Sequence, residues 1–319
     1  MASRAPPPSL AGASRRALAP VGLGLPRPRA RPSLRARSSP VRAAFRAPPR
    51  TCSSATAEAR AVLRALREAT SDASTASTPP PPRRVRIELP LPPADRDTDD
   101  IVYLGLHGQA ADWSGGMAQR FRVTKRLVED GMLDGYDREY LGLLDRDADG
   151  MGVWKVTRSG GGPESHDATV VTHPADTTFG FFAKLLRGEY GAKVADPDHL
   201  VVVVNAFWSG AGEKVGQPWE LGLRREARRV LSPETGDWEK VYCARRTRSA
   251  AGVEGTLVRA WPGPWRLYDA EGVRTVMEAE TEPSNREMAE ALNKDAGVRE
   301  AAGFNRDASM TSRDDDVIT

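Results

Sequence analysis

The sequence predicts an α/β domain of the Rossmann-like type, with a mostly parallel, doubly wound sheet and an antiparallel meander at its C-terminal edge. Three observations support this prediction. Strand-like and helix-like segments alternate through the first half of the body. The run Leu200–Val204 has almost no polar face, which is typical of a central strand covered on both sides. After residue 238, short strand-like runs follow one another without helices between them.

The chain divides by composition into four parts. Residues 1–43 contain nine arginines, no acidic residue and no long apolar segment, which is the composition of an organelle transit peptide. Residues 44–83 combine a short helix with a Pro-rich disordered linker, residues 84–304 form a single α/β domain, and residues 305–319 form a disordered tail. The tetrad Val41–Ala44 resembles a chloroplast stromal processing site, so we expect a chloroplast transit peptide at residues 1–43. A mitochondrial transit peptide and a basic tail that binds an acidic partner are the alternatives.

Hydrophobic patterns predict the strands of the body. Val85–Leu91 alternates apolar and polar residues, as a strand with one covered face does. The other expected strands of the first half are Ile101–Leu106, Tyr140–Leu144, Gly152–Val156, Thr169–Thr172 and Leu200–Val204. The expected strands of the meander are Lys240–Arg246, Thr256–Trp261 and Trp265–Asp269, with a tight turn at Pro262–Pro264.

Apolar residues at near-helical spacing predict the helices. Ala55–Ala69 places Val62, Leu63 and Leu66 on one side of a short helix. A last helix begins after Ser284, whose side chain is a plausible N-cap. The expected helices between these two are Met117–Met132, Thr178–Tyr190 and Trp219–Leu231.

The charge distribution argues against nucleic acid as a partner. The whole chain has 46 basic and 43 acidic residues, and removing the nine arginines of the leader leaves 46 − 9 = 37 basic against 43 acidic ones. A mildly acidic body is a poor general binder of phosphate backbones. No apolar run approaches the roughly 20 residues that a membrane-spanning helix needs, so we expect a soluble protein.

The stretch DWSGGMAQRF, residues 112–121, is the first candidate for a small-molecule site. Its two glycines stand where a loop becomes a helix, and the free backbone N–H groups of a helix N-terminus attract anions. Neither a Walker pattern nor G-x-G-x-x-G is present, so a tight structural turn is the alternative. A nucleophilic Ser114 is disfavoured, because Asp112 replaces the first glycine of the G-x-S-x-G elbow.

Polar and aromatic residues directly follow the expected central strand. In open α/β sheets, ligands bind at the carboxyl ends of the strands. A crevice at the carboxyl end of this strand would be lined by the residues that follow the strand and by the glycine turn. The alternative is that these residues cap the core and a turn. The candidate ligand-binding residues are Asp112, Trp113, Gly115, Gly116, Gln119, Arg120, Asn205 and Trp208.

The meander offers a candidate surface for protein binding. Trp261 and Trp265 flank the Pro-Gly-Pro turn, and Arg259 and Arg266 are close in sequence. Aromatic residues and arginine are the usual anchors of protein interfaces. The alternative is a hairpin whose tryptophans lie over the sheet.

Metal and cofactor signals are weak. Residues 145–150, DRDADG, copy the first half of a calcium loop, but position twelve is Val156 instead of glutamate. The four histidines lack the spacing of metal ligands, and Cys52 and Cys243 are too few for a cysteine-rich site. We therefore expect no metal, no cofactor and no catalytic residue.

Four motifs, IELPLP, DWSGGMAQRF, VVVVNAFW and LVRAWPGPWRLYD, together resemble one family, the plastid domain of unknown function nineteen-ninety-five. The resemblance covers roughly residues 84–304. Members include the low-photosystem-II-accumulation assembly factor and the C-terminal half of a plastid adenylate kinase. The resemblance therefore implies a chloroplast location, a Rossmann-like domain and a link to photosynthesis, and it supplies no catalytic residues.

These observations lead to two functional hypotheses. The first is a non-catalytic protein of the chloroplast stroma or the stromal thylakoid surface, which supports photosystem II assembly or maintenance by binding other proteins. The alternative is a nucleotide- or phosphate-binding module, which includes an enzyme of small phosphorylated metabolites.

Overall fold

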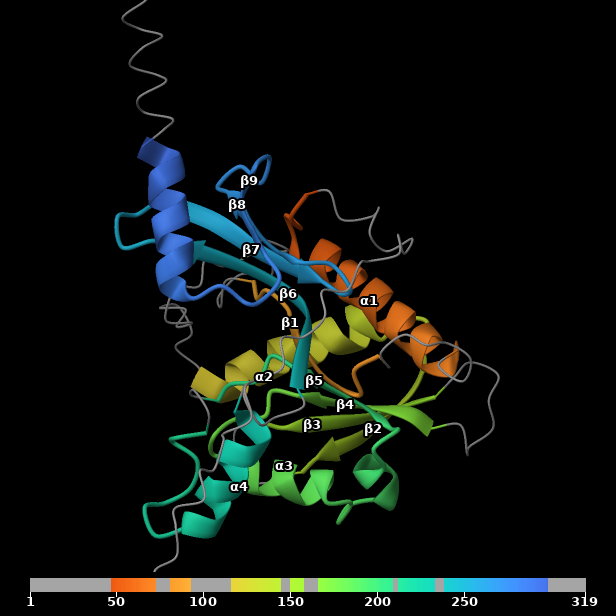
Figure 1. The fold of residues 1–319 in the computed structure, drawn as a ribbon. Coiled ribbons are helices and arrows are strands. Elements are labelled where there is room, and N and C mark those ends of the chain that lie inside the picture. The colour runs from red at the N-terminus through yellow and green to blue at the C-terminus, as the bar shows by residue number, and fades with distance from the viewer. Residues whose placement is uncertain are drawn as a thin grey trace, which may run out of the picture. The chain divides into compact units, whose positions relative to one another are not determined.

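The computed structural model describes residues 47–72, 81–92, 116–144, 150–157, 166–208, 212–232 and 238–297. The strands of these residues form one nine-stranded sheet (Figure 1). In spatial order they are β2 (Asp137–Leu143), β3 (Gly152–Thr157), β4 (His166–Thr172), β5 (Leu200–Val204), β1 (Arg84–Glu88), β6 (Trp238–Arg248), β7 (Glu254–Ala260), β8 (Trp265–Asp269) and β9 (Thr275–Ala279). The expected strand at residues 101–106 lies outside the described residues.

The sheet is mixed, so the prediction of a Rossmann-like, doubly wound parallel sheet is wrong. Among the described strands only the pairs β4–β5, β5–β1 and β1–β6 are parallel. The strands β2, β3 and β4 follow one another in the chain, and each pairs antiparallel with the next. The strands β6 to β9 form the antiparallel meander expected at the C-terminal edge.

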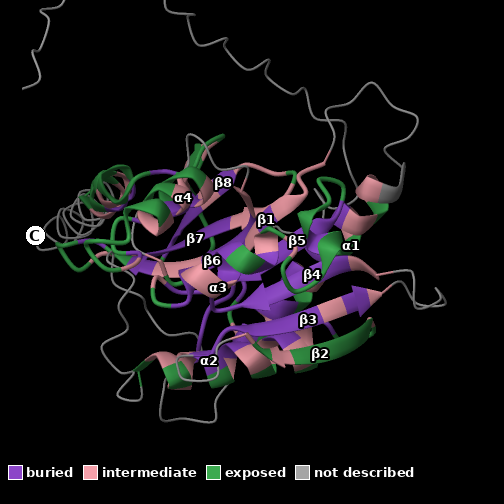
Figure 2. Cartoon of the chain, turned by 90° about the horizontal axis from the view of Figure 1, so that it is seen from below, coloured by how far each residue is buried: buried purple, intermediate pink, exposed green. Residues whose placement is uncertain are grey.

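The central position of β5 agrees with the sequence prediction. It lies between β4 and β1, and all five of its residues are buried. Leu200, Val202 and Val204 pack on one face of the sheet, and Val201 and Val203 pack on the other. Figure 2 shows the contrast between these buried central strands and the exposed edge strand β2.

Helices cover both faces of the sheet. The first face carries α1 (Cys52–Asp72) and the π-helical segment η2 (Leu127–Met132), which continues directly from α2 (Gly116–Arg126). The second face carries α3 (Phe179–Leu186), the short 3-10 helix η3 (Ala192–Ala195) and α4 (Leu221–Leu231). No helix among the residues listed above for the structure has the length and apolar character that crossing a membrane requires.

The helix α1 belongs to the main core, although its residues precede the domain limits 84–304 expected from the sequence. Its side chains at helical spacing are fully buried against the sheet: Ala55, Ala59, Val62, Leu63 and Leu66. Gly131 of η2 allows a close approach to α1, because a Cβ there would lie 2.7 Å from Thr56 Oγ1. The ion pair Arg67–Asp167 (2.5 Å) joins α1 to β4.

A last helix over residues 285–297 packs against the meander and covers a smaller, separate hydrophobic core. Ser284 is its N-cap, as predicted: Glu287 N donates to Ser284 Oγ (3.2 Å), and Ser284 N donates to the Glu287 carboxylate (2.7 Å). This reciprocal pair is a capping box. The core beneath the helix consists of Cys243, Leu257, Trp265, Leu267, Met288 and Leu292.

The contact between Glu58 of α1 and Tyr242 of β6 predicts a pH dependence of stability. Burial raises the pKa of Glu58 from 4.5 to about 7, although Tyr242 Oη donates a hydrogen bond to its carboxylate (2.9 Å). The folded protein therefore holds this proton more tightly than the unfolded chain does. The contribution is complete below pH 4.5 and is lost as the pH rises through about 7.

We expect the free energy of unfolding to fall across this window by at most about 1.4 kcal/mol per pH unit. Glu58→Gln should flatten this slope in urea denaturation series, because glutamine keeps an acceptor for Tyr242 and does not ionise. The exposed Glu68 on the same helix provides the control Glu68→Gln. An unchanged slope in Glu58→Gln would show that another group causes it.

Candidate ligand site at the carboxyl ends of the parallel strands

The carboxyl ends of β4, β5 and β1 meet at one edge of the sheet, because these strands are parallel neighbours. His173 follows β4 with φ 55°, and Asn205 follows β5 with φ 49°. They are the non-glycine residues with positive φ in the described chain. Such backbone conformations are costly and cluster at functional sites, so this edge is a candidate site on backbone geometry alone.

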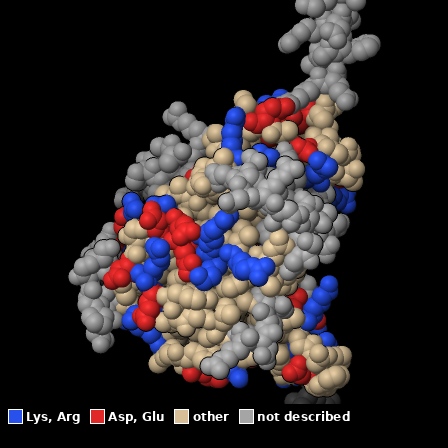
Figure 3. Space-filling model, turned by 180° about the vertical axis from the view of Figure 1, so that it is seen from behind, with Lys and Arg blue, Asp and Glu red and all other residues tan. Residues whose placement is uncertain are grey.

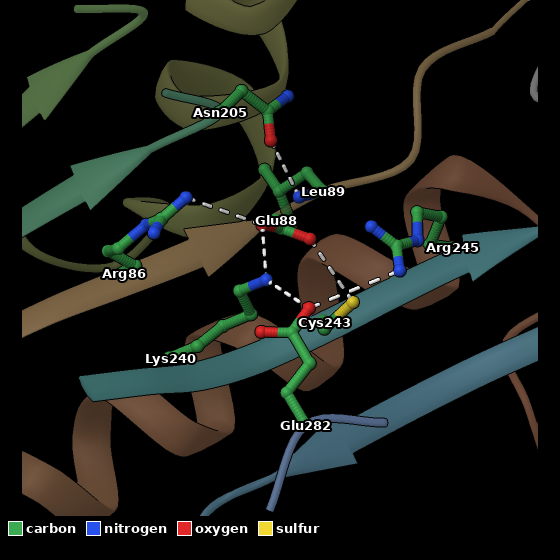
Figure 4. A network of polar contacts seen from close by, with 8 residues as sticks. All are labelled: Arg86, Glu88, Leu89, Asn205, Lys240, Cys243, Arg245 and Glu282. Carbon is green, nitrogen blue, oxygen red and sulfur yellow. Dashed lines mark hydrogen bonds and ion pairs between the residues drawn. The ribbon is translucent and has the colours of Figure 1, made fainter. Parts of the chain in front are cut away.

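Asn205 joins three elements at this edge. Its Oδ1 accepts a hydrogen bond from Leu89 N (2.7 Å), just beyond β1 (Figure 4). Its Nδ2 donates to Thr124 Oγ1 of α2 (3.4 Å). Asparagine tolerates the left-handed backbone region better than most residues do. It can therefore occupy the turn after β5 while its side chain forms hydrogen bonds with both neighbouring elements. Through Thr124, α2 lies beside the end of β5, whereas the glycine turn that was predicted to lie there is described only from Gly116 onward.

A cation and a neutral imidazole lie next to each other at this edge. The guanidinium carbon of Arg120 lies 4.8 Å from the centroid of the Phe207 ring, and no carboxylate of the described residues forms an ion pair with it. The Phe207 ring is nearly parallel to the imidazole of His173, with centroids 6.1 Å apart. The N–H groups of Arg120 can therefore donate hydrogen bonds to an anion while the Phe207 ring stabilises the positive charge through a cation–π contact.

His173 offers an unused hydrogen-bonding atom. The residue is 2% exposed, and its Nδ1 is buried without a hydrogen-bond partner among the described residues. Burial first, and then the charge of Arg120, lower the pKa of His173 to about 4, so the imidazole is neutral at neutral pH. Buried polar atoms are normally paired, so a group that bonds to Nδ1 would remove a real cost.

A charged network lies on the other side of Asn205, at the end of β1 (Figure 4). Lys240 Nζ lies 2.7 Å from the Glu88 carboxylate and 2.6 Å from that of Glu282. Arg86 lies 3.7 Å from Glu88, and Arg245 lies 4.0 Å from Glu282. The network ties the end of β1 to β6 and to the segment before the last helix.

This network holds its groups in forms that are unsuited to catalysis. Burial alone would raise the pKa of Glu88, but the cations Lys240, Arg86 and Arg245 together lower it to about 2. Cys243 Sγ donates to the Glu88 carboxylate (3.4 Å). Burial, with the charge of Glu88, raises the pKa of the Cys243 thiol far above neutral pH. An ionised carboxylate of low pKa is a weak base, and a protonated thiol is a weak nucleophile.

The predicted ligand-binding residues are only partly brought together. Gly116 is the first residue of α2 with φ 59°, and Gln119 and Arg120 lie one turn further on. Trp208 turns to the second face, where its ring packs 5.7 Å from that of Phe182, so it caps the core as the alternative proposed. Asp112, Trp113 and Gly115 lie outside the described residues.

Two residues of the site were missed by sequence reasoning. His173 follows a strand just as Asn205 does, so the rule that ligands bind at strand carboxyl ends would have found it. Phe207 has no polar group, so its sequence position gives no signal of its contact with Arg120.

The expected aromatic platform of the meander does not form. Trp265 is 2% exposed, because its position on β8 faces the last helix. Arg259 pairs with Glu239 (2.6 Å), and Arg266 pairs with Glu278 (2.9 Å). Trp261 is partly buried against the core, as the alternative hairpin arrangement proposed.

The histidines do not gather around a metal position in the described chain. His166 and His199 both lie within hydrogen-bonding distance of Thr169 Oγ1 (3.0 and 2.9 Å), at the opposite end of β4 from His173. No group of three or more histidine, cysteine, aspartate or glutamate residues suited to a metal occurs among the described residues. The calcium-like segment 145–149 lies outside them.

Comparison with protein families finds a match over residues 49–290 to the family described as Domain of unknown function (DUF1995). The chain belongs to this family. The match begins before α1, in agreement with the packing of that helix into the core. Comparisons with curated proteins and with solved structures found no match.

Replacing Glu88 should destabilise the protein strongly. Glu88→Gln leaves Lys240 and Arg86 without their shared carboxylate, so we expect a loss of about 2–4 kcal/mol in urea denaturation at neutral pH. The Glu88 contribution is present above pH 4.5 and is lost as the pH falls through about 2.

The surface pair of Glu278 with Arg266 supplies the control, because the Glu278 side chain is 53% exposed. Glu278→Gln should change stability by less than about 1 kcal/mol. Equal losses in both variants would contradict a special role for the network.

Proposed function

We propose that this member of the family binds a small anionic ligand, bearing a phosphate or carboxylate, at the carboxyl ends of β4 and β5. The observation that carries the proposal is the pairing of Arg120, which has no carboxylate partner in the described chain, with the unsatisfied Nδ1 of His173. His173 directly follows the parallel strand β4, and Arg120 lies on α2, the helix beside the end of β5.

The ligand would be held by three kinds of donor. Arg120 would contribute a charged hydrogen bond or a bidentate pair. The neutral His173, in its Nδ1–H tautomer, would contribute a second donor. The first turn of α2, which begins at Gly116, has backbone N–H groups without partners inside the helix. Asn205 would keep these elements at a fixed separation through its bonds to Leu89 and Thr124.

We further propose that the protein acts by binding and not by catalysis, and that nucleic acid is not its partner. The ionic form of Glu88 and the protonated form of Cys243 support the first statement. On the face seen in Figure 3, acidic and basic side chains lie next to one another, which supports the second.

The Arg120 site can be tested with a panel of inorganic phosphate, nucleotides and sugar phosphates. A ligand present at a hundred times its dissociation constant should add about 2.7 kcal/mol to the free energy of unfolding. Arg120→Gln should weaken the binding of that ligand about tenfold to a hundredfold in calorimetry, because one charge-assisted hydrogen bond is lost.

Arg122 is the matched control, since it is an exposed arginine on the same helix. Arg122→Gln should leave the affinity unchanged. The proposal fails if no member of the panel stabilises the protein, or if both arginine variants lose affinity equally.

A second candidate function is protein binding in support of photosystem II assembly, in the chloroplast stroma or at the thylakoid surface. The family resemblance supports it, and so does the edge strand β2, where Tyr140, Leu141 and Leu143 are 38%, 57% and 42% exposed. If this function is correct, Leu141→Asp should abolish co-migration with photosystem II assembly complexes on native gels. Unchanged co-migration would exclude β2 as the binding strand.

The chloroplast location is also a proposal, and the composition of residues 1–43 supports it. A fluorescent protein fused after residue 43 should enter chloroplasts, and replacing the nine arginines by glutamine should leave it in the cytosol.

A further inference from the structure

A solvent-exposed tryptophan stands directly before α4. Trp219 is 76% exposed and Leu221 is 66% exposed, and every residue from 217 to 222 is exposed. The other tryptophans of the described chain are buried or half-buried: Trp154, Trp208, Trp238, Trp261 and Trp265. An exposed tryptophan beside an exposed leucine is unfavourable in water unless something covers it.

The turn that presents Trp219 is held in place by hydrogen bonds. Gln217 N donates to the Glu220 carboxylate (2.6 Å), and Glu220 N donates to Gln217 O (2.9 Å). Arg224 of α4 donates to the carbonyl oxygens of Val215 and Gly216 (3.2 and 3.4 Å). The tryptophan is therefore displayed by an organised turn, and the carboxylate of Glu220 is occupied within it.

The exposed side of α4 is basic. Leu221, Arg225 and Arg228 share this side by helical spacing, and Arg229 borders it; all four are exposed. The opposite side, with Ala227 and Leu231, is buried against the sheet. Figure 2 shows this division of α4 between exposed and half-buried residues.

The charge of this region is opposite to that of the body. Segment 212–231 carries five basic residues, Lys214, Arg224, Arg225, Arg228 and Arg229, against three acidic ones, Glu213, Glu220 and Glu226. Glu226 is engaged by Arg187 (2.6 Å). The body from residue 44 onward has the reverse balance, 37 basic against 43 acidic residues.

We propose that Trp219, Leu221 and the arginine side of α4 form a surface that binds peripherally to an anionic lipid bilayer. Tryptophan favours the boundary between headgroups and acyl chains, and arginines are attracted to anionic headgroups. The helix would lie in the plane of the membrane surface with its buried side still on the sheet. Charge complementarity favours an anionic bilayer over an apolar protein groove, and this surface is independent of the Arg120 site.

The test uses the full chain and vesicles of phosphatidylcholine with or without phosphatidylglycerol. Because residues 1–43 carry nine arginines that also attract anionic vesicles, insertion must be measured at Trp219 itself. Brominated phosphatidylglycerol quenches tryptophans that enter the bilayer. We expect quenching that Trp219→Phe removes, and none with brominated phosphatidylcholine alone.

The arginine side is tested by Arg225→Gln combined with Arg228→Gln, which should weaken vesicle binding about tenfold or more. The control Val273→Ala changes a side chain that is 78% exposed outside α4 and should have no effect. Thermal unfolding of Trp219→Phe and Val273→Ala should match that of the unaltered chain, since both side chains are exposed.

Three results would overturn the proposal. The first is quenching that persists in Trp219→Phe, and the second is equal quenching by neutral and anionic vesicles. The third is self-association in sedimentation equilibrium that Trp219→Phe abolishes in the absence of lipid, which would assign the surface to a second copy of the chain.

Discussion

The burial of β5 on both faces is the constraint on which the rest of the structure depends. All five side chains are at most 1% exposed, and fully burying a valine or leucine contributes about 1.5–3 kcal/mol. Together these contributions are comparable with the whole net stability of a typical domain, about 5–15 kcal/mol. A strand of this composition must lie between covering layers, and it determines which helices can pack on each side.

The parallel pairing around β5 also creates the polar edge. Three strands that run in the same direction end together, so their terminal backbone groups and the residues after them are crowded at one place. Asn205 accepts a hydrogen bond from one of these backbone groups, Leu89 N. The Glu88–Lys240 network neutralises charges that would otherwise be buried alone. At this edge His173 Nδ1 and Arg86 Nε remain without a hydrogen-bond partner among the described residues.

Local signals in the sequence predicted local structure well. The apolar run of β5, the periodicity of α1, the N-cap Ser284 and the antiparallel meander all follow from neighbouring residues, and all are present. The sheet topology was predicted wrongly, because strand pairing between β2, β3 and β4 depends on how the connections run in space. Hydrophobic patterns alone do not reveal those connections.

The candidate site was predicted only in part for a similar reason. The approach of Arg120 and Asn205 to the same edge follows from the rule for strand ends. The charged network does not, because Lys240 reaches Glu88 through a parallel pairing between segments some 150 residues apart in the chain. The exposure of Trp219 and the burial of Trp265 likewise depend on which residue of a strand or turn faces a distant helix.

The connectivity of the sheet has a consequence for how the chain acquires its structure. The meanders β2–β4 and β6–β9 join neighbours in sequence, so each closes short loops and can form early. The parallel pairs β5–β1 and β1–β6 instead close loops of more than a hundred residues. We expect β1 to pair with β5 and β6 last, because it is the strand that joins two preformed halves of the sheet. The polar edge at the end of β1 would then form only when folding is nearly complete.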